Sequence, residues 1–154
     1  MDEAAVSSRL LDLLDGMHRY QIWRVAGAGA LTSSVLRRAD MVYVVTTGTL
    51  ASLAAAQHMF DWLATNNPRA LTLQIFNAVS PRMPLSPIMI SQVTGRESKM
   101  TIPWKKGVGQ DLASSIPLHE TRHSLNREFR AIADQILGNT GENGKRGIFG
   151  FWSR

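Results

Sequence analysis

ADMVYVVTTGTLASLAAAQHMFDWLATNNPRALTLQIFN, residues 39–77, is the stretch that decides the fold. Its two continuous apolar runs, 41–46 and 71–76, are typical of strands that are buried on both faces of a parallel sheet. The segment between them predicts a helix over 50–64, which Thr49 caps and Asn66-Asn67-Pro68 ends. A strand, a helix and a second strand in this order predict a parallel crossover unit.

Working outward, the same reasoning predicts further elements on both sides of this unit. We expect helices over 2–17, 31–38, 108–115 and 124–137, a short helix ending near Val93, and strands over 20–25 and 99–102. We expect a glycine turn over 27–30 and a loop over 77–87. Strands that alternate with helices predict an α/β fold of three layers with a mostly parallel sheet. This domain covers 1–137, and 138–154 reads as a flexible linker with a basic and aromatic tail.

Two of the expected helices are amphipathic. In the first, the apolar residues recur at steps of three and four, and in the last they lie on one face: Val6, Leu10, Leu13, Leu14 and Met17, then Leu125, Phe129, Ile132 and Ile136. Such stripes predict the faces that pack on the rest of the domain.

Composition excludes several classes of protein. The 154 residues contain no cysteine, which excludes a disulfide scaffold, a thiolate metal site and a cysteine nucleophile. A net charge of +5 favours anionic partners. Met1-Asp2-Glu3 is acidic where a signal peptide is basic, and no apolar run approaches the roughly 20 residues that span a bilayer. We expect a cytoplasmic protein.

Two motifs suggest chemistry without the context that the chemistry needs. His119-Glu120-Thr121-Arg122-His123 has the spacing of a zinc hydrolase helix, with His119 and His123 as metal ligands, but no third ligand follows at a convincing distance. The Gly27–Thr32 turn resembles a dinucleotide fingerprint, but it lacks the third glycine and the later acidic residue. The four histidines form no arrangement typical of a catalytic triad.

The order of segments from Leu10 to Leu137 resembles the carboxy-terminal half of the ParA/MinD family of ATPases. The matching stretches are YQIWRVAGAG, ADMVYVVTTGTLASLAAAQHMFDWL, LTLQIFNAVS, TIPWKKGVGQDLASSIPL and the closing helix from Ser124. The resemblance implies a partial P-loop NTPase-like sheet. It also implies that Asn77 and Pro103 contact adenine, although Ala78 stands where the family has an arginine.

The phosphate-binding chemistry of that family is missing from this sequence. The chain has no glycine-rich phosphate loop with a closing lysine and hydroxyl, and no acidic residue near Val25 to serve magnesium. Alone, this chain should therefore not hydrolyse ATP, and no catalytic residue is assigned. ATP and magnesium would bind only if a missing amino-terminal half or a partner chain completed the site. The family's phosphate-loop strand lies between those matching 20–25 and 41–46, so its absence leaves a gap or a repacked sheet.

Basic residues in the last part of the chain suggest two anionic partners. The tail resembles the membrane-targeting tail of MinD-like proteins, with contact residues Lys145, Arg146, Ile148, Phe149, Phe151 and Trp152. Its apolar side chains suit the lipid interface and its cations suit anionic headgroups, although the tail could instead fill a groove on the domain or on a partner. Arg122, Arg127 and Arg130 lie where ParA-like relatives bind DNA nonspecifically.

We therefore expect a non-catalytic or truncated ParA/MinD-like protein that positions or partitions a chromosome, plasmid, pilus or secretion machinery. It would act as a homodimer or with a partner protein, in the cytoplasm or at the inner face of the cell membrane. Two alternatives stay open: the second half of an active ATPase, and a zinc hydrolase that uses His119 and His123.

Overall fold

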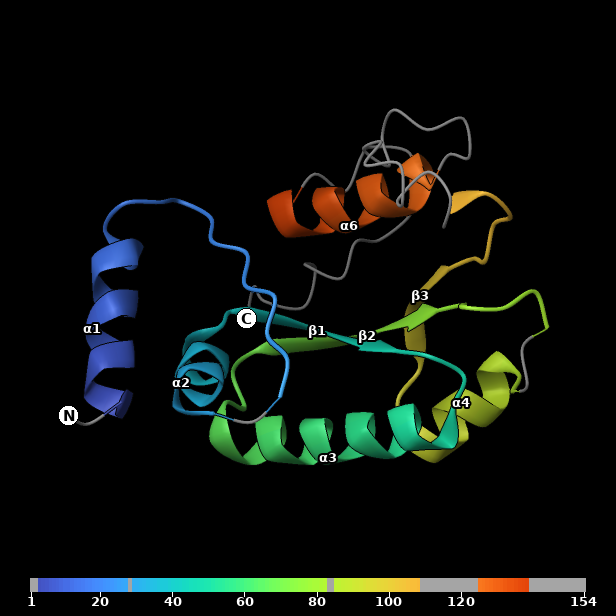
Figure 1. The fold of residues 1–154 in the computed structure, drawn as a ribbon, viewed down its shortest axis with the longest axis horizontal. Helices are drawn as coiled ribbons and strands as arrows, with labels where there is room; N and C mark the ends of the chain where they lie inside the picture. Colours follow the sequence, from blue (N-terminus) through green and yellow to red (C-terminus); the bar gives the residue numbers. More distant parts are fainter. Residues whose placement is uncertain (1–2, 28, 83–84, 109–124, 139–154) are drawn as a thin grey trace, which may run out of the picture.

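The computed structural model describes residues 3–27, 29–82, 85–108 and 125–138. Eight helices and strands follow one another in these residues (Figure 1), and their bounds are α1 (Glu3–Asp15), α2 (Ala30–Arg38), β1 (Met41–Thr46), α3 (Leu50–Asn66), β2 (Leu71–Asn77), α4 (Pro87–Thr94), β3 (Ser98–Ile102) and α6 (Asn126–Leu137). The α/β fold predicted from the sequence is confirmed.

The sheet has three strands in the order β1-β2-β3, and both neighbouring pairs are parallel. The register places Met41 beside Leu71 and Thr46 beside Phe76. Asn77 pairs with Ile102 at the far end of β2. Because all strands run the same way, their carboxyl ends meet at one edge of the sheet, where ligands bind in open α/β folds.

Helices lie on both faces of this sheet, with α3 and α4 on one side and α6 on the other (Figure 1). Two buried clusters join α3 to its neighbours: Leu53, Phe76, Ala78 and Ile90 form one, and Leu36, Val42 and Leu63 form the other. On the opposite face, the Tyr43 hydroxyl donates to Gln135 Oε1 of α6 at 3.2 Å. Burial on that face raises the pKa of Tyr43.

A buried polar network links β1, β2 and α4 beneath the carboxyl edge. Gln74 Nε2 donates to Thr46 Oγ1 at 3.1 Å, and Thr94 Oγ1 lies 3.0 Å from Gln74 Oε1, to which it donates. All three residues are at most 4% exposed. We call this the Thr46–Gln74–Thr94 network. Because every buried group in it is paired, it fixes where the strand ends lie without a desolvation penalty.

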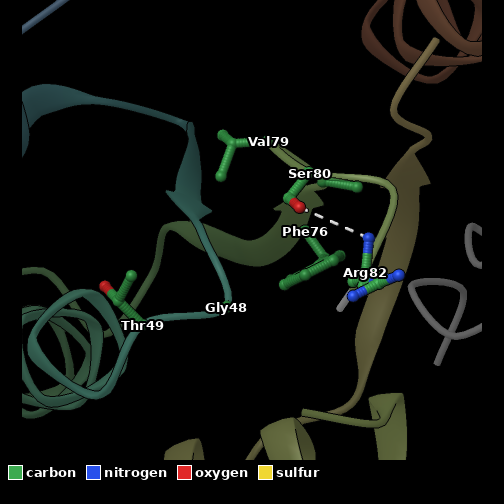
Figure 2. A pocket seen from close by; sticks show the side chains of 7 residues that line it. Gly48, Thr49, Phe76, Val79, Ser80 and Arg82 are labelled. Carbon is green, nitrogen blue, oxygen red and sulfur yellow. Dashed lines mark hydrogen bonds between the residues drawn. The ribbon is translucent and has the colours of Figure 1, made fainter. Parts of the chain in front are cut away.

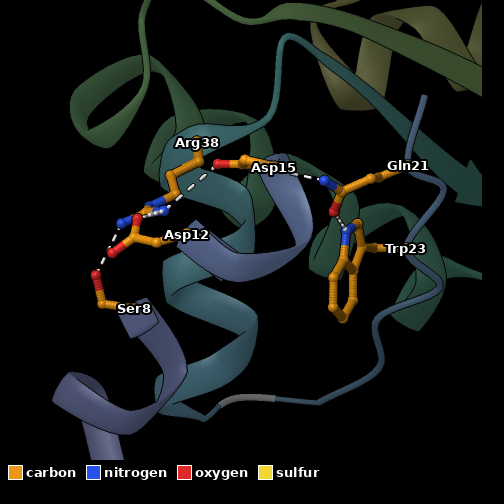
Figure 3. Close-up of polar contacts among 6 residues, drawn as sticks. All are labelled: Ser8, Asp12, Asp15, Gln21, Trp23 and Arg38. Carbon is orange, nitrogen blue, oxygen red and sulfur yellow. Dashed lines mark hydrogen bonds and ion pairs between the residues drawn. The ribbon is translucent and has the colours of Figure 1, made fainter. Parts of the chain in front are cut away.

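Helix α1 is attached to α2 by polar contacts (Figure 3). Arg38 of α2 donates to Ser8 Oγ at 2.7 Å and forms ion pairs with Asp12 and Asp15, at 2.5 and 3.6 Å. These three partners share one face of α1, with Leu11 buried at 3% exposed beside them. Successive residues of an α-helix are rotated by about 100° around its axis. The apolar stripe that was predicted to be buried therefore lies on the opposite face of α1. Its members Val6, Leu10, Leu13 and Met17 are 45–68% exposed.

The main sequence predictions of helices and strands are confirmed, with boundaries within a few residues. Thr49 is the N-cap of α3 and its side chain accepts a hydrogen bond from Ser52 N at 3.2 Å, and Asn67 is the C-cap. Gly27 has a φ of 78°, as the predicted glycine turn requires. Strand β1 is more exposed than the predicted strand buried on both faces, because it is an edge strand of the sheet and Val45 is 57% exposed.

The predicted strand over 20–25 is wrong. This segment has no regular secondary structure, and Ile22 is 85% exposed. Side-chain hydrogen bonds hold it instead (Figure 3). Trp23 Nε1 donates to Gln21 Oε1, and Gln21 Nε2 donates to Asp15 Oδ1. A strand needs a partner strand to pair its backbone, so apolar and aromatic composition alone was insufficient.

Some predictions lie outside the described residues. They concern most of the helix over 108–115 and the linker and tail from residue 139. Within the described part of the chain, no helix is long and apolar enough to cross a membrane.

Candidate functional site

The carboxyl edge of the sheet holds a pocket between two loops (Figure 2). One loop follows β1 and contributes Gly48 and Thr49, and the other follows β2. The pocket has about 300 Å³ of free volume, and its lining residues are Gly48, Thr49, Phe76, Ala78, Val79, Ser80 and Arg82. Pockets at this edge are the usual binding sites of parallel α/β sheets, which makes this the candidate site.

The loop after β1 is held by reciprocal contacts at the start of α3. Thr47 N donates to Ser52 Oγ at 2.9 Å, while Ser52 N donates to Thr49 Oγ1 at 3.2 Å. A threonine followed three residues later by a second polar residue is a sequence pattern typical of a helix start. The turn that forms one wall of the pocket is therefore fixed by its own sequence.

The floor and far wall of the pocket come from β2 and the loop that follows it. Phe76 and Ala78 are buried, at 2% and 8% exposed, and Val79 is 60% exposed. Arg82 is exposed and its backbone N–H donates to Ser80 Oγ at 3.3 Å (Figure 2). The pocket thus combines an apolar interior with one cationic side chain at its wall.

Asn77 and Pro103 lie near each other at the same edge. Ala78 N donates to Ile102 O at 2.9 Å, which continues the pairing of Asn77 with Ile102 and brings Pro103 beside the end of β2. Asn77 is half-buried. The two residues that the family resemblance assigns to adenine therefore lie at the ends of two paired strands, and neither lines the pocket.

Charge is distributed unevenly between the two edges of the sheet. The segments that leave the carboxyl ends, 47–49, 78–86 and 103–108, contain the cations Arg82, Lys105 and Lys106 and no acidic residue. The segments that enter the amino ends contain both signs: Asp40, Arg69, Arg96 and Glu97. Electrostatics at the carboxyl edge therefore favours an anionic ligand.

Other predicted site residues are scattered or lie outside the description. Arg127 and Arg130 are exposed on α6, with Glu128 between them. Outside the described residues are Arg122, His119, His123, Lys145, Arg146, Ile148, Phe149, Phe151 and Trp152. In the described ranges, no group of three or more His, Asp or Glu side chains is placed to hold a metal.

Sequence reasoning missed Phe76, Ser80 and Arg82 as site residues. Phe76 was one more apolar position of a strand, and Arg82 lay in a loop whose position depends on the paired sheet. The available signal was topological: a basic residue in a proline-rich loop directly after a parallel strand belongs to the carboxyl edge.

No family model matches this chain, and no curated protein or solved structure matches it either.

Proposed function

We propose that this chain is a ParA/MinD-like positioning module that acts by binding a partner and does not hydrolyse ATP by itself. The observation that carries the proposal is the register that pairs Asn77 with Ile102 and so places Asn77 and Pro103 at the same carboxyl edge of a parallel sheet. The stretches that resemble the family and begin at residues 39, 71 and 101 contribute to β1, β2 and β3, which are neighbours in the sheet in chain order. That arrangement supports the relationship, while the missing phosphate loop argues against turnover.

The positioning role is tested by microscopy of the chain fused to a fluorescent protein in the cell that makes it. We expect foci or an enrichment at one region of the cell, because the module attaches to a localised partner. The fluorescent protein alone is the control and should fill the cell evenly. An even distribution of the fusion would overturn the positioning role.

The absence of turnover is tested on the purified chain with Mg-ATP. We expect phosphate release no faster than in buffer, because the sequence supplies neither a phosphate cradle nor an acidic magnesium ligand. Turnover that survives repeated purification and scales with the amount of chain would contradict the proposal.

A second candidate function is the carboxy-terminal half of an active ATPase. The observation in its favour is the outer edge of β1, which pairs with no strand in the described residues, while segment 20–25 forms no strand and its Val25 packs against the cluster that contains Val42. The mass of the polypeptide in its native cell separates the candidates. A mass well above 17.0 kDa, with peptides of a phosphate loop, would favour the ATPase half.

A further inference from the structure

We propose that the pocket at the carboxyl edge binds one apolar side chain from an acidic segment of a partner protein, with Arg82 pairing with a carboxylate of that segment. This inference rests on the proposed function, since it names the chemistry of the partner that the positioning module would bind. It concerns the pocket between the Gly48–Thr49 turn and residues 78–82, and not the neighbouring Asn77 and Pro103.

The size of the pocket favours a single side chain. Its volume of about 300 Å³ lies at the lower end of the range for small-molecule sites, which run to about 1,000 Å³. Phe76, Ala78 and Val79 give it an apolar lining. A branched or aromatic side chain would replace water there and gain the free energy of burial.

The positive charge of the carboxyl edge favours acidic residues beside the apolar residue of the partner's segment. Arg82 lies at the pocket itself, and Lys105 and Lys106 belong to the neighbouring loop after β3. None of the three carboxyl-edge segments contains an acidic residue. A segment with aspartate or glutamate beside its apolar residue is therefore complementary to this edge, and a basic segment is repelled.

Hydrogen bonds hold one wall of the pocket and the strands below it. The contacts between Thr47, Thr49 and Ser52 hold one wall, and the Thr46–Gln74–Thr94 network holds the strand ends below it. Binding would then order the partner's segment but little of this chain, which lowers the entropic cost.

The test uses three short acetylated peptides and NMR titration of the isotopically labelled chain. In the first, one phenylalanine is flanked by aspartates; in the second, alanine replaces the phenylalanine; in the third, lysines replace the aspartates. We expect the first to shift the amides of Gly48, Val79 and Ser80 in a saturable way. Its affinity should exceed that of the alanine peptide by about tenfold or more, the value of one buried side chain.

Arg82→Glu tests the charge. We expect this substitution to weaken binding of the aspartate peptide by about two- to fivefold, which is the value of an exposed ion pair, and to strengthen binding of the lysine peptide. Arg24→Glu is the matched control, because it changes the net charge equally at an exposed residue outside the pocket, and it should leave the aspartate peptide's affinity nearly unchanged. Because Arg82 is exposed, its variant should keep the thermal unfolding transition of the parent chain.

Two results would overturn the proposal: equal binding of the aspartate and lysine peptides, or shifts that avoid the pocket amides. Imaging separates its failure from that of the proposed function. If the fluorescent fusion forms foci but the peptides give either of those two results, the pocket is not the docking site and positioning stands. If the parent fusion itself spreads evenly, the positioning role falls.

Discussion

Helices α1 and α3 meet the rest of the molecule through opposite kinds of surface. Helix α3 buries Leu53, Ala56, Phe60 and Leu63 at 0–3% exposed, against the sheet and its neighbours. Helix α1 turns its polar face to α2, where Arg38 binds Ser8 and two aspartates (Figure 3), and leaves Leu10 and Leu13 exposed. Both helices were predicted from the sequence.

The difference shows that a helical pattern and a buried face are separate properties. The spacing of apolar residues predicts that a helix forms, and both helices do form. Which face is buried depends on what the neighbouring elements offer. The sheet offers α3 an apolar surface, while α2 offers α1 a cation near Leu11. Helix α3 should therefore be part of the stable core, and α1 should detach more easily.

The largest expected effect comes from Phe60→Ala in α3. Phe60 is 3% exposed, and the guanidinium of Arg96 lies 4.8 Å from the centre of its ring. Removing the ring should lower the free energy of unfolding by about 3–5 kcal/mol. Urea denaturation followed by circular dichroism measures the change. A loss below about 1 kcal/mol would mean that α3 is no better packed than α1.

Leu11→Ala should have the next largest effect, because Leu11 is the buried leucine of α1. We expect a loss of about 2 kcal/mol, at the low end for a buried leucine, since α1 can separate from α2 while the sheet stays folded. Hydrogen exchange should rise in the peptide covering α1 and stay constant in those covering β1 and α3. Equal increases in all three would contradict independent detachment.

Arg38→Gln should weaken the attachment of α1 by less. Its ion pairs join side chains that are 37% and 62% exposed, so we expect about 0.2–1 kcal/mol. Faster hydrogen exchange in α1 is the readout, and high salt should reproduce part of the effect in the parent chain. Arg69→Gln removes an exposed arginine elsewhere and is the control. If both variants behave alike, Arg38 does not hold α1.

Leu13→Ala should have the smallest effect and completes a matched pair with Leu11→Ala. The two leucines belong to the same helix, but Leu13 is 68% exposed and Leu11 is 3% exposed. Alanine suits a helix at least as well as leucine does, so we expect a change within about 0.5 kcal/mol. The same urea denaturation measures it. A loss as large as that of Leu11→Ala would show that the stripe around Leu13 is covered in solution.

The sequence predicted most of the fold because local signals agreed there. The runs 41–46 and 71–76, the cap at Thr49 and the stop at Asn67 all point to one crossover unit, and the structure has it. Prediction failed where the outcome depended on a neighbour. The segment 20–25 has strand composition but no partner strand, and the pocket exists only because pairing brings the loops after β1 and β2 together. Its residues are adjacent in space and separated in sequence.

The Thr46–Gln74–Thr94 network has a consequence for folding. Sliding β1 past β2 by one residue would turn Thr46 away from Gln74, because successive side chains of a strand point to opposite faces. The amide of Gln74 would then be buried without its partner, at a cost of about 1–3 kcal/mol. The apolar residues 41–45 of β1 discriminate poorly between alignments, and the hydrogen bonds of the Thr46–Gln74–Thr94 network disfavour the misaligned ones. The network therefore favours the native register of two strands that are separated along the chain.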